Sequence, residues 1–484
     1  MIMMNIKKIM VAVLAGITLA ACTKDFEKIN TDPDNLEKVS AATLLNPILY
    51  EMSTFNASRS EGFTMDIMQV RLPWPSVSGG THRYVVTENA GNSTWNTYYR
   101  WLNNIREVDE AAIADNNNLS YRAIALTLKA WGFSLLTDCF GDVPMSEALK
   151  AEQNQLKPAF DKQEDIYKEL LKNLDSANSW LTAPKDVLSN NREMLYDNDL
   201  KKWRKFANSL QMRLLLRISN RTETKAYEKL AAMVADPVKY PVFSNNAEAA
   251  LYKITGITPN ISPWSRVQDF VNFRCAGEFF VNTLNDFADP RRDKWLSQAT
   301  DTAKVPKKIG FKGIPAGHDG SDGQFFFNPS NMLAPLGVAP TMIAVVMTYS
   351  EVEFIKAELA QKGLIAGGAQ SYYENAVKAS IEQWGATVPA NYFQNPKAAY
   401  DGTLERIMLQ KYIALFFNDY QQWFEYRRTK LPVLPVGPGM LNDKKMPVRF
   451  KYPLTVQTAN PDNYRRAVTN MGGDDINTKV WWEK

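Results

Sequence analysis

RAIALTLKAWGFSLLTDCFGDVPMSEAL, the stretch from Arg122 to Leu149, decides the fold class. Its first half is apolar on nearly every side of a helical repeat, which is typical of a helix buried inside a large helical domain. Gly141 then stands where the end of a helix favours a left-handed residue, and Pro144 prevents the helix from continuing. The stretch therefore predicts a buried helix closed by a turn whose role is structural.

Further helices are predicted on both sides of this one, because apolar residues recur there at steps of three and four. The predicted helices span 95–112, 121–136, 166–181, 200–219, 341–361, 369–384 and 403–426. They fall into neighbouring pairs, which indicates stacked helix hairpins of the tetratricopeptide kind. We expect an all-α protein.

Residues 237–340 break this pattern, because glycine, proline and asparagine become frequent and the apolar periodicity is lost. Shorter irregular segments run over 72–93 and 431–465. A long irregular stretch inside a compact protein is usually a functional surface. No low-complexity linker separates domains, so we expect residues 22–484 to form one domain.

The N-terminus has the layout of a secretory signal peptide: Lys7 and Lys8, an apolar run over 9–20, and small residues before Cys22. Leu19-Ala20-Ala21-Cys22 looks like a bacterial lipobox. We predict a signal peptide over 1–21 and lipidation at Cys22, which would tether the protein to a membrane through its acyl chains alone.

The net charge and the cysteine content limit the partners and the disulfide bonds that we expect. The net charge of +4 falls to +2 without Lys7 and Lys8, and no basic run is present, so nucleic acid is not an expected partner. After lipidation of Cys22 only Cys139 and Cys275 remain, and a single bridge between them stays open.

Enzymatic motifs are scarce. His82 and His318 are the only histidines, which excludes a metal site of three histidines and leaves few routes to a Ser-His-Asp triad. The loop GHDGSDGQ could bind calcium through Asp319 and Asp322, but an ordinary solvated turn is the better interpretation. We expect neither a cofactor nor catalysis.

Six segments together resemble the SusD/RagB family of outer-membrane nutrient-binding lipoproteins. They are INTDPDN (29–35), RAIALTLKAWGFSLLTDCFGDVPMSEAL (122–149), WRKFANSLQMRLLLRIS (203–219), YSEVEFIKAELAQKG (349–363), IMLQKYIALFFNDYQQWFEYRRTKLPVLP (407–435) and RFKYPLTVQTANPDNYRRAV (449–468). The resemblance implies tetratricopeptide-like helix pairs supporting a loop-rich ligand surface. It also implies capture of oligosaccharides, or in some members peptides, at the cell surface for a SusC-like TonB-dependent transporter.

Candidate ligand residues follow from the chemistry of sugars, whose flat C–H faces stack on exposed aromatic rings while polar side chains bind the hydroxyl rim. Aromatic residues on loops are therefore more informative than those in helix stripes. The candidates are Trp74, His82, Arg83 and Tyr84 in one loop, Trp264, Arg266 and Gln268 in another, and Phe325 with its neighbours Phe326 and Phe327 in the FFF run. Arg427 and Arg428 are expected to hold carboxylates or carbonyls within the scaffold.

These observations predict a non-catalytic, surface-tethered lipoprotein that binds glycans. Three alternatives stay open: a peptide-binding member, a surface glycosidase with two carboxyl groups facing each other across a cleft, and a scaffold with no ligand of its own.

Overall fold

The computed structural model describes residues 40–76, 80–184, 192–318, 325–338 and 342–484. Within this part, Ala41–Lys484 is one compact unit. The predicted signal peptide, Cys22, Asp319 and Asp322 lie outside the described residues.

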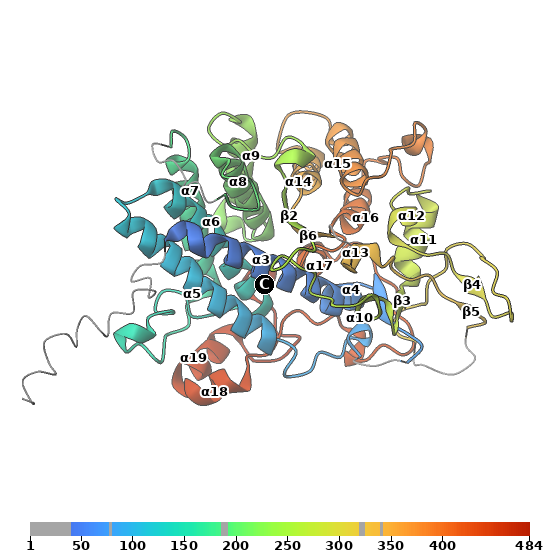
Figure 1. Cartoon of the computed structure of the whole chain (residues 1–484), viewed down its shortest axis with the longest axis horizontal. Helices are drawn as coiled ribbons and strands as arrows, with labels where there is room; N and C mark the ends of the chain where they lie inside the picture. Colours follow the sequence, from blue (N-terminus) through green and yellow to red (C-terminus); the bar gives the residue numbers. More distant parts are fainter. Residues whose placement is uncertain (1–39, 77–79, 185–191, 319–324, 339–341) are drawn as a thin grey trace, which may run out of the picture. The chain divides into compact units, whose positions relative to one another are not determined.

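Paired helices form most of the protein, and consecutive helices pack against one another (Figure 1). The main helices are α3 (Ala41–Arg59), α5 (Asn92–Ala114), α6 (Leu119–Phe140), α7 (Gln163–Trp180), α8 (Leu200–Arg217), α9 (Ala226–Ala235), α14 (Tyr349–Gln361), α15 (Ala369–Gln383), α16 (Leu404–Ala414) and α17 (Gln421–Thr429). Pairs such as α5 with α6, α7 with α8 and α14 with α15 confirm the predicted all-α class.

Helix α6 is the buried helix that the sequence predicted. The side chain of Asn118 caps its first turn by accepting a hydrogen bond from the backbone N–H of Tyr121. Gly141 ends it with a φ of +88°, the conformation that favours glycine. In the described chain α6 alone is long and apolar enough to cross a membrane, and 89% of its apolar window is buried inside the protein, as in the core helix of a folded domain.

Two predicted helices are wrong in part. In the range 341–361 strand β6 (Met342–Met347) comes first, because this segment, rich in the β-branched residues Ile and Val, pairs with strand β2 (Ala250–Ile254). Helix α14 follows it. The range 403–426 is two helices, α16 and α17, separated where Phe417 and Asp419 take φ values of +63° and +27°.

Short elements make up the remainder, including the predicted irregular region, where loops dominate (Figure 1). They are η1 (Ser60–Thr64), α4 (Met65–Ile67), β1 (Arg71–Pro73), η2 (Thr81–Arg83), η3 (Ala151–Gln153), η4 (Thr222–Thr224), η5 (Asn246–Glu248), α10 (Val267–Val271), β3 (Arg274–Ala276), α11 (Glu278–Asp286), α12 (Arg292–Trp295), β4 (Thr300–Asp301), β5 (Phe327–Asn328), α13 (Pro335–Val338), η6 (Tyr392–Gln394), η7 (Asn442–Lys444), α18 (Leu454–Ala459), α19 (Pro461–Met471) and η8 (Trp481–Glu483). Three two-stranded sheets join β1 with β3, β2 with β6 and β4 with β5.

Cys139 and Cys275 are buried and both are free thiols, so the bridge that the sequence left open is not formed.

Candidate functional site

Two of the three predicted ligand loops meet in space. The Trp74 ring lies 6.1 Å from the ring of His318 and 5.7 Å from that of Phe325, and the Phe325 ring lies 6.1 Å from that of Phe327. Trp74, Phe325 and Phe327 are all partly exposed. We call these three side chains the aromatic platform.

The ribbon of β1 and β3 holds Trp74 in place. Pro73 of β1 lies opposite Arg274 of β3, and the backbone N–H of Trp74 donates to the carbonyl of Phe273 at 3.0 Å. On the other side, Nε2 of His318 lies 3.3 Å from the carbonyl oxygen of Pro73. Backbone contacts therefore fix the root of the Trp74 side chain before any ligand arrives.

Segment 431–441 supports the platform from a third direction. Arg83 donates from Nε to the carbonyl of Gly439 at 2.7 Å, and the backbone N–H of Leu441 donates to the carbonyl of Arg83 at 2.9 Å. Gly439 packs so closely on the Gly317 carbonyl that a Cβ at this position would collide with it. Glycine is needed here to bring the segments together.

A buried charge cluster lies beneath the ribbon. Glu61 binds Arg71 at 2.7 Å, and Asp66 binds Arg274 at 2.7 Å. Burial raises the pKa of Asp66 to about 6, although Arg274 opposes this rise. Because these carboxylates are already held by arginines, they stabilise the ribbon and are not available to a ligand.

His82 and Tyr84 lie deeper than a ligand contact would require. The His82 ring is fully buried at 5.4 Å from that of His318, and Tyr84 is buried as well. Burial, with His318 and Arg83 nearby, lowers the pKa of His82 to about 4. Burial also raises the pKa of Tyr84 to about 12. Both residues support the loop, whereas the half-exposed Arg83 lies at its surface.

The third predicted loop directs its tryptophan inward. Trp264 is only 9% exposed and packs against Phe270 and Phe417, with ring centroids 4.9 and 5.9 Å away. Arg266 is exposed and bound to Asp269 at 2.6 Å, and Gln268 is exposed. The Trp264 indole therefore offers little surface for stacking.

Further exposed apolar residues lie in the segments of the platform, and of these the sequence indicated Phe326 but not Phe273, Val433 or Val436. Phe273, whose carbonyl accepts from Trp74, is 76% exposed, and Phe326 is 82% exposed. Val433 and Val436 are exposed on the supporting segment 431–441. No local signal separates Phe273 from a core phenylalanine in the sequence VNFRC, because its exposure depends on the pairing of β1 with β3.

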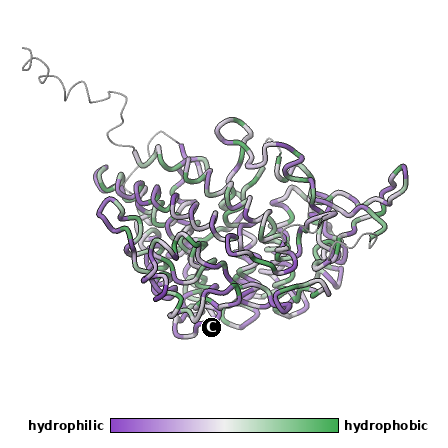
Figure 2. Tube along the Cα trace, turned by 90° about the horizontal axis from the view of Figure 1, so that it is seen from below, coloured by the Kyte–Doolittle hydropathy of each residue, from purple (hydrophilic) through white to green (hydrophobic). Residues whose placement is uncertain are grey.

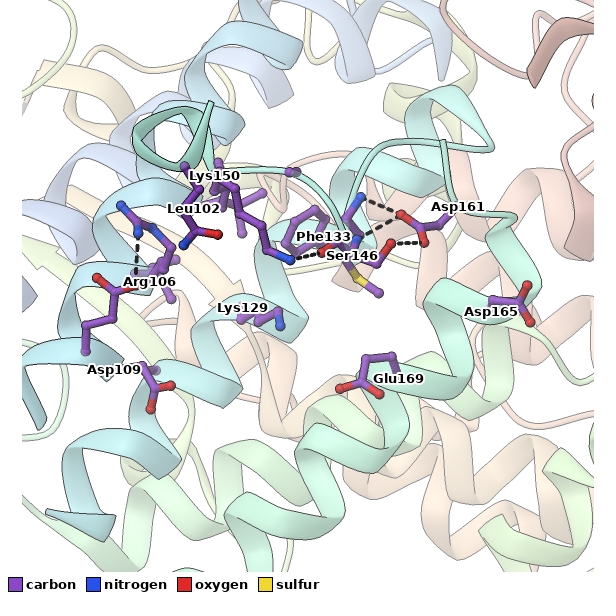
Figure 3. A pocket seen from close by; sticks show the side chains of 17 residues that line it. Leu102, Arg106, Asp109, Lys129, Phe133, Ser146, Lys150, Asp161, Asp165 and Glu169 are labelled. Atoms are coloured by element: carbon purple, nitrogen blue, oxygen red, sulfur yellow. Dashed lines mark hydrogen bonds and ion pairs between the residues drawn. The ribbon is translucent and has the colours of Figure 1, made fainter. Parts of the chain in front are cut away.

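A cavity of about 540 Å³ lies elsewhere, between α5, α6, α7 and the loop after α6. Figure 3 shows Lys129 of α6 at its centre, with Asp109 of α5 and Glu169 of α7 on either side. Asp161 is held by the backbone N–H groups of Met145 and Ser146. Phe133 is the cavity's one aromatic residue among those described, so it offers no platform for a sugar.

No group of three or more histidine, cysteine, aspartate or glutamate side chains that could hold a metal occurs in the described ranges. The calcium interpretation of Asp319 and Asp322 lies outside these ranges and stays a prediction.

Both the sequence and the fold resemble those of known proteins. A family model described as SusD-like, starch-binding and associating with the outer membrane matches residues 33–453. An outer-membrane protein of Bacteroides vulgatus, for which a role in nutrient binding has been suggested, superposes with a TM-score of 0.80 at 25% identity, covering 92% of this chain and 100% of that one.

Two further solved structures share the fold. A SusD homologue from Bacteroides fragilis gives a TM-score of 0.76 at 23% identity, over 92% of this chain and 100% of that one. A chitin-binding SusD homologue from Flavobacterium johnsoniae gives 0.75 at 22% identity, over 91% and 97%. No curated protein matches the sequence at a significant level.

Proposed function

The chain belongs to the SusD-like family of outer-membrane-associated starch-binding proteins, and from this premise we propose that it captures oligosaccharides on the aromatic platform and passes them to a SusC-like transporter. Tethering through a lipidated Cys22, with the platform outside the cell, is part of the same proposal. The chitin-binding relative supports a glycan as the ligand class.

One observation carries the proposal: residues from separate loops converge on Trp74. Its indole is partly exposed, Phe325 packs beside it at 5.7 Å, and Phe273 adds an exposed ring at the next position of the ribbon. Aromatic faces of this kind stack on the C–H face of a sugar ring. Arg83 and the exposed Asn272 supply donors for hydroxyl groups at the rim.

The carboxylates of the described residues favour binding over hydrolysis. Cleavage of a glycoside needs two carboxyl groups that face each other across the bond. Glu61 and Asp66, which lie beneath the platform, are held by Arg71 and Arg274. In the cavity between α5, α6 and α7, Asp109 and Glu169 lie on either side of Lys129, and Asp109 is bound to Arg122 at 2.9 Å. The acids at both places therefore have basic partners or neighbours, which favours binding over hydrolysis.

Calorimetric titration of the purified protein with a panel of polysaccharides, oligosaccharides and peptides tests the proposal. We expect binding of a glycan without the release of products, and a loss of affinity of about tenfold or more in Trp74→Ala, because a central aromatic anchor is removed. Peptide-only binding or product formation would contradict it.

Trp180→Ala is the matched control. Trp180 is also a partly exposed tryptophan, but it ends α7 and lies over the guanidinium of Arg122 at 5.0 Å, away from the ligand loops. Its replacement should leave glycan affinity unchanged. An equal loss in both variants would mean that tryptophan replacement acts through stability and not through the platform.

A further inference from the structure

Residues 300–312 form a strongly basic arm next to the aromatic platform. Figure 1 shows the strands β4 and β5 of this region standing out beyond α11 and α12, and Figure 2 shows the same projection from another side. The arm carries four exposed lysines, namely Lys304, Lys307, Lys308 and Lys312. Its single acid is Asp301, so its net charge is +3.

Within the described ranges, none of the ammonium groups of these four lysines forms an ion pair, and that of Lys312 lies over the Phe327 ring. The Asp301 carboxylate is already used, because its Oδ1 accepts from the backbone N–H of Lys307 at 2.9 Å and from that of Ala303 at 3.4 Å. With a net charge of +4 over all 484 residues, the arm concentrates positive charge at one place.

A series of rings connects the arm to the platform. The ammonium group of Lys312 lies 5.5 Å from the ring centroid of Phe327. The ring centroids of Phe327 and Phe325 are 6.1 Å apart, and those of Phe325 and Trp74 are 5.7 Å apart. A sugar that reaches the Phe327 end of the platform would therefore place its substituents close to a positive charge.

Backbone pairing fixes this geometry. The N–H of Ser330 donates to the carbonyl of Lys312 at 2.8 Å, and the N–H of Lys312 donates to Oγ of Ser330 at 3.1 Å. Thr300 pairs with Asn328, and Ala299 pairs with Gly310. Lys312 is thus held beside Phe327, so little backbone ordering is needed when a ligand binds.

Among the described residues, charges of both signs lie near the platform, and the exposed Glu278 packs through its backbone on Gly313, next to Lys312. Arg83 adds a further positive group at the surface of the loop. The acids beneath the ribbon, Glu61 and Asp66, are each paired with an arginine. An anion at the Phe327 end of the platform therefore meets the ammonium group of Lys312.

We propose that the ligand of this site is an anionic glycan, a chain bearing carboxylate or sulfate groups, with Lys312 contacting the anionic substituent. The inference rests on the proposed function, because the platform must first hold the sugar ring. Lys304, Lys307 and Lys308 raise the local potential and speed the encounter with a polyanionic chain.

Matched glycan pairs test the charge directly. In the methyl ester of oligogalacturonate an uncharged ester replaces each carboxylate, and dextran lacks the sulfate groups of dextran sulfate. We expect the purified protein to bind at least one anionic member about tenfold more tightly than its neutral partner at low salt, with the difference shrinking at ~0.5 M salt as screening increases.

Variants separate this inference from the platform itself. Lys312→Ala should lower the affinity for the anionic glycan about fivefold and that for its neutral partner less than about twofold, since only the charge contact is removed. Lys201→Ala, which removes an exposed lysine in the first turn of α8, should change neither. All these substitutions are on the surface, so the far-ultraviolet circular dichroism should stay the same.

Two outcomes overturn the inference in distinguishable ways. If the neutral members bind as tightly as the anionic ones and Lys312→Ala matches Lys201→Ala, the preference for anions is wrong while platform binding stands. If neither series binds, and Trp74→Ala changes nothing, the proposed function fails and this inference fails with it.

Discussion

The interior of the helical body and the ligand loops use charged and aromatic residues in opposite ways. In the interior, Arg428 reaches both oxygens of Glu358 at 2.8 and 2.6 Å and also contacts Glu425 at 2.9 Å, and all three residues are buried. At the loops, Trp74 and Lys312 keep exposed surface and have few partners. The most recognisable sequence motif thus marks the scaffold, and the ligand site is built from unremarkable loop residues.

The largest effect on stability is expected from breaking the buried cluster of Arg428, Glu358 and Glu425. Arg428→Ala leaves Glu358 and Glu425 without their shared partner, although Lys411 still binds Glu425 at 2.7 Å. A buried carboxylate that loses its counter-charge costs about 3 to 5 kcal/mol of stability. Urea denaturation followed by circular dichroism measures this loss.

Arg106→Ala is the control for that experiment. Arg106 binds Glu110 at 2.9 Å, but the pair lies at the surface of α5. Surface pairs contribute roughly 0 to 1 kcal/mol, so this variant should stay within about 1 kcal/mol of the parent. Equal losses in Arg106→Ala and Arg428→Ala would contradict the distinction between the interior and the surface.

A smaller effect is expected in the pH dependence of stability, through the buried carboxyl group of Asp419. Burial raises its pKa to about 6, despite the opposing charge of Arg213. The unfolded chain loses this proton near pH 3.8, whereas the folded protein keeps it to about pH 6. Between these values the unfolded state binds fewer protons, so stability falls as the pH rises.

Asp419→Asn removes this titration while keeping the oxygen that accepts from the backbone N–H of Tyr420. The free energy of unfolding of the variant, relative to that of the parent, should therefore rise by on the order of 2 to 3 kcal/mol between pH 4 and pH 7. Urea denaturation at each pH gives this difference. A difference that does not change with pH would show that Asp419 ionises normally in the folded protein.

Much of the helical fold could be predicted from the sequence, because periodic apolar residues decide which face of a helix is buried. Helices α5 to α8 and α15 agree with the predicted ranges to within a few residues. The errors at Met342–Met347 and at Phe417 have tertiary causes. Strand β6 forms because β2 lies alongside it. The break after α16 depends on positive φ values that no local sequence motif predicts.

The site was less predictable. The sequence correctly placed Trp74 and Phe325 on loops, but their contact joins two loops that are distant in the chain, and segment 431–441 packs against one of them. It could not tell that His82 would be buried, since His82 packs beside His318, or that Phe273 would be exposed, since its position depends on the pairing of β1 with β3. The prediction that Arg427 and Arg428 hold carboxylates or carbonyls within the scaffold is confirmed. Arg427 binds Glu483 and the carbonyl of Asp138, and Arg428 binds Glu358.

The smallest expected effect is at the loops, and its sign is opposite to that of Asp419. Burial lowers the pKa of His82 to about 4, with the positive charge of Arg83 and Arg274 and the neighbouring His318 acting in the same direction. In the unfolded chain His82 binds a proton below about pH 6.5, whereas in the folded loop it binds this proton only below about pH 4. Between these values the unfolded state binds more protons, so the loop is stabilised as the pH rises and loses stability as it falls.

Hydrogen exchange at Tyr84, whose N–H donates to the carbonyl of Thr81 at 3.0 Å, reports on this loop. After correction for intrinsic rates, its protection should fall by about 1 to 2 kcal/mol between pH 7 and pH 4.5, a value reduced for partial solvent screening. In His82→Asn the protection should no longer depend on pH. If protection in the parent instead fell as the pH rose, the loop would follow the interior carboxylates, and the contrast between the two regions would not hold.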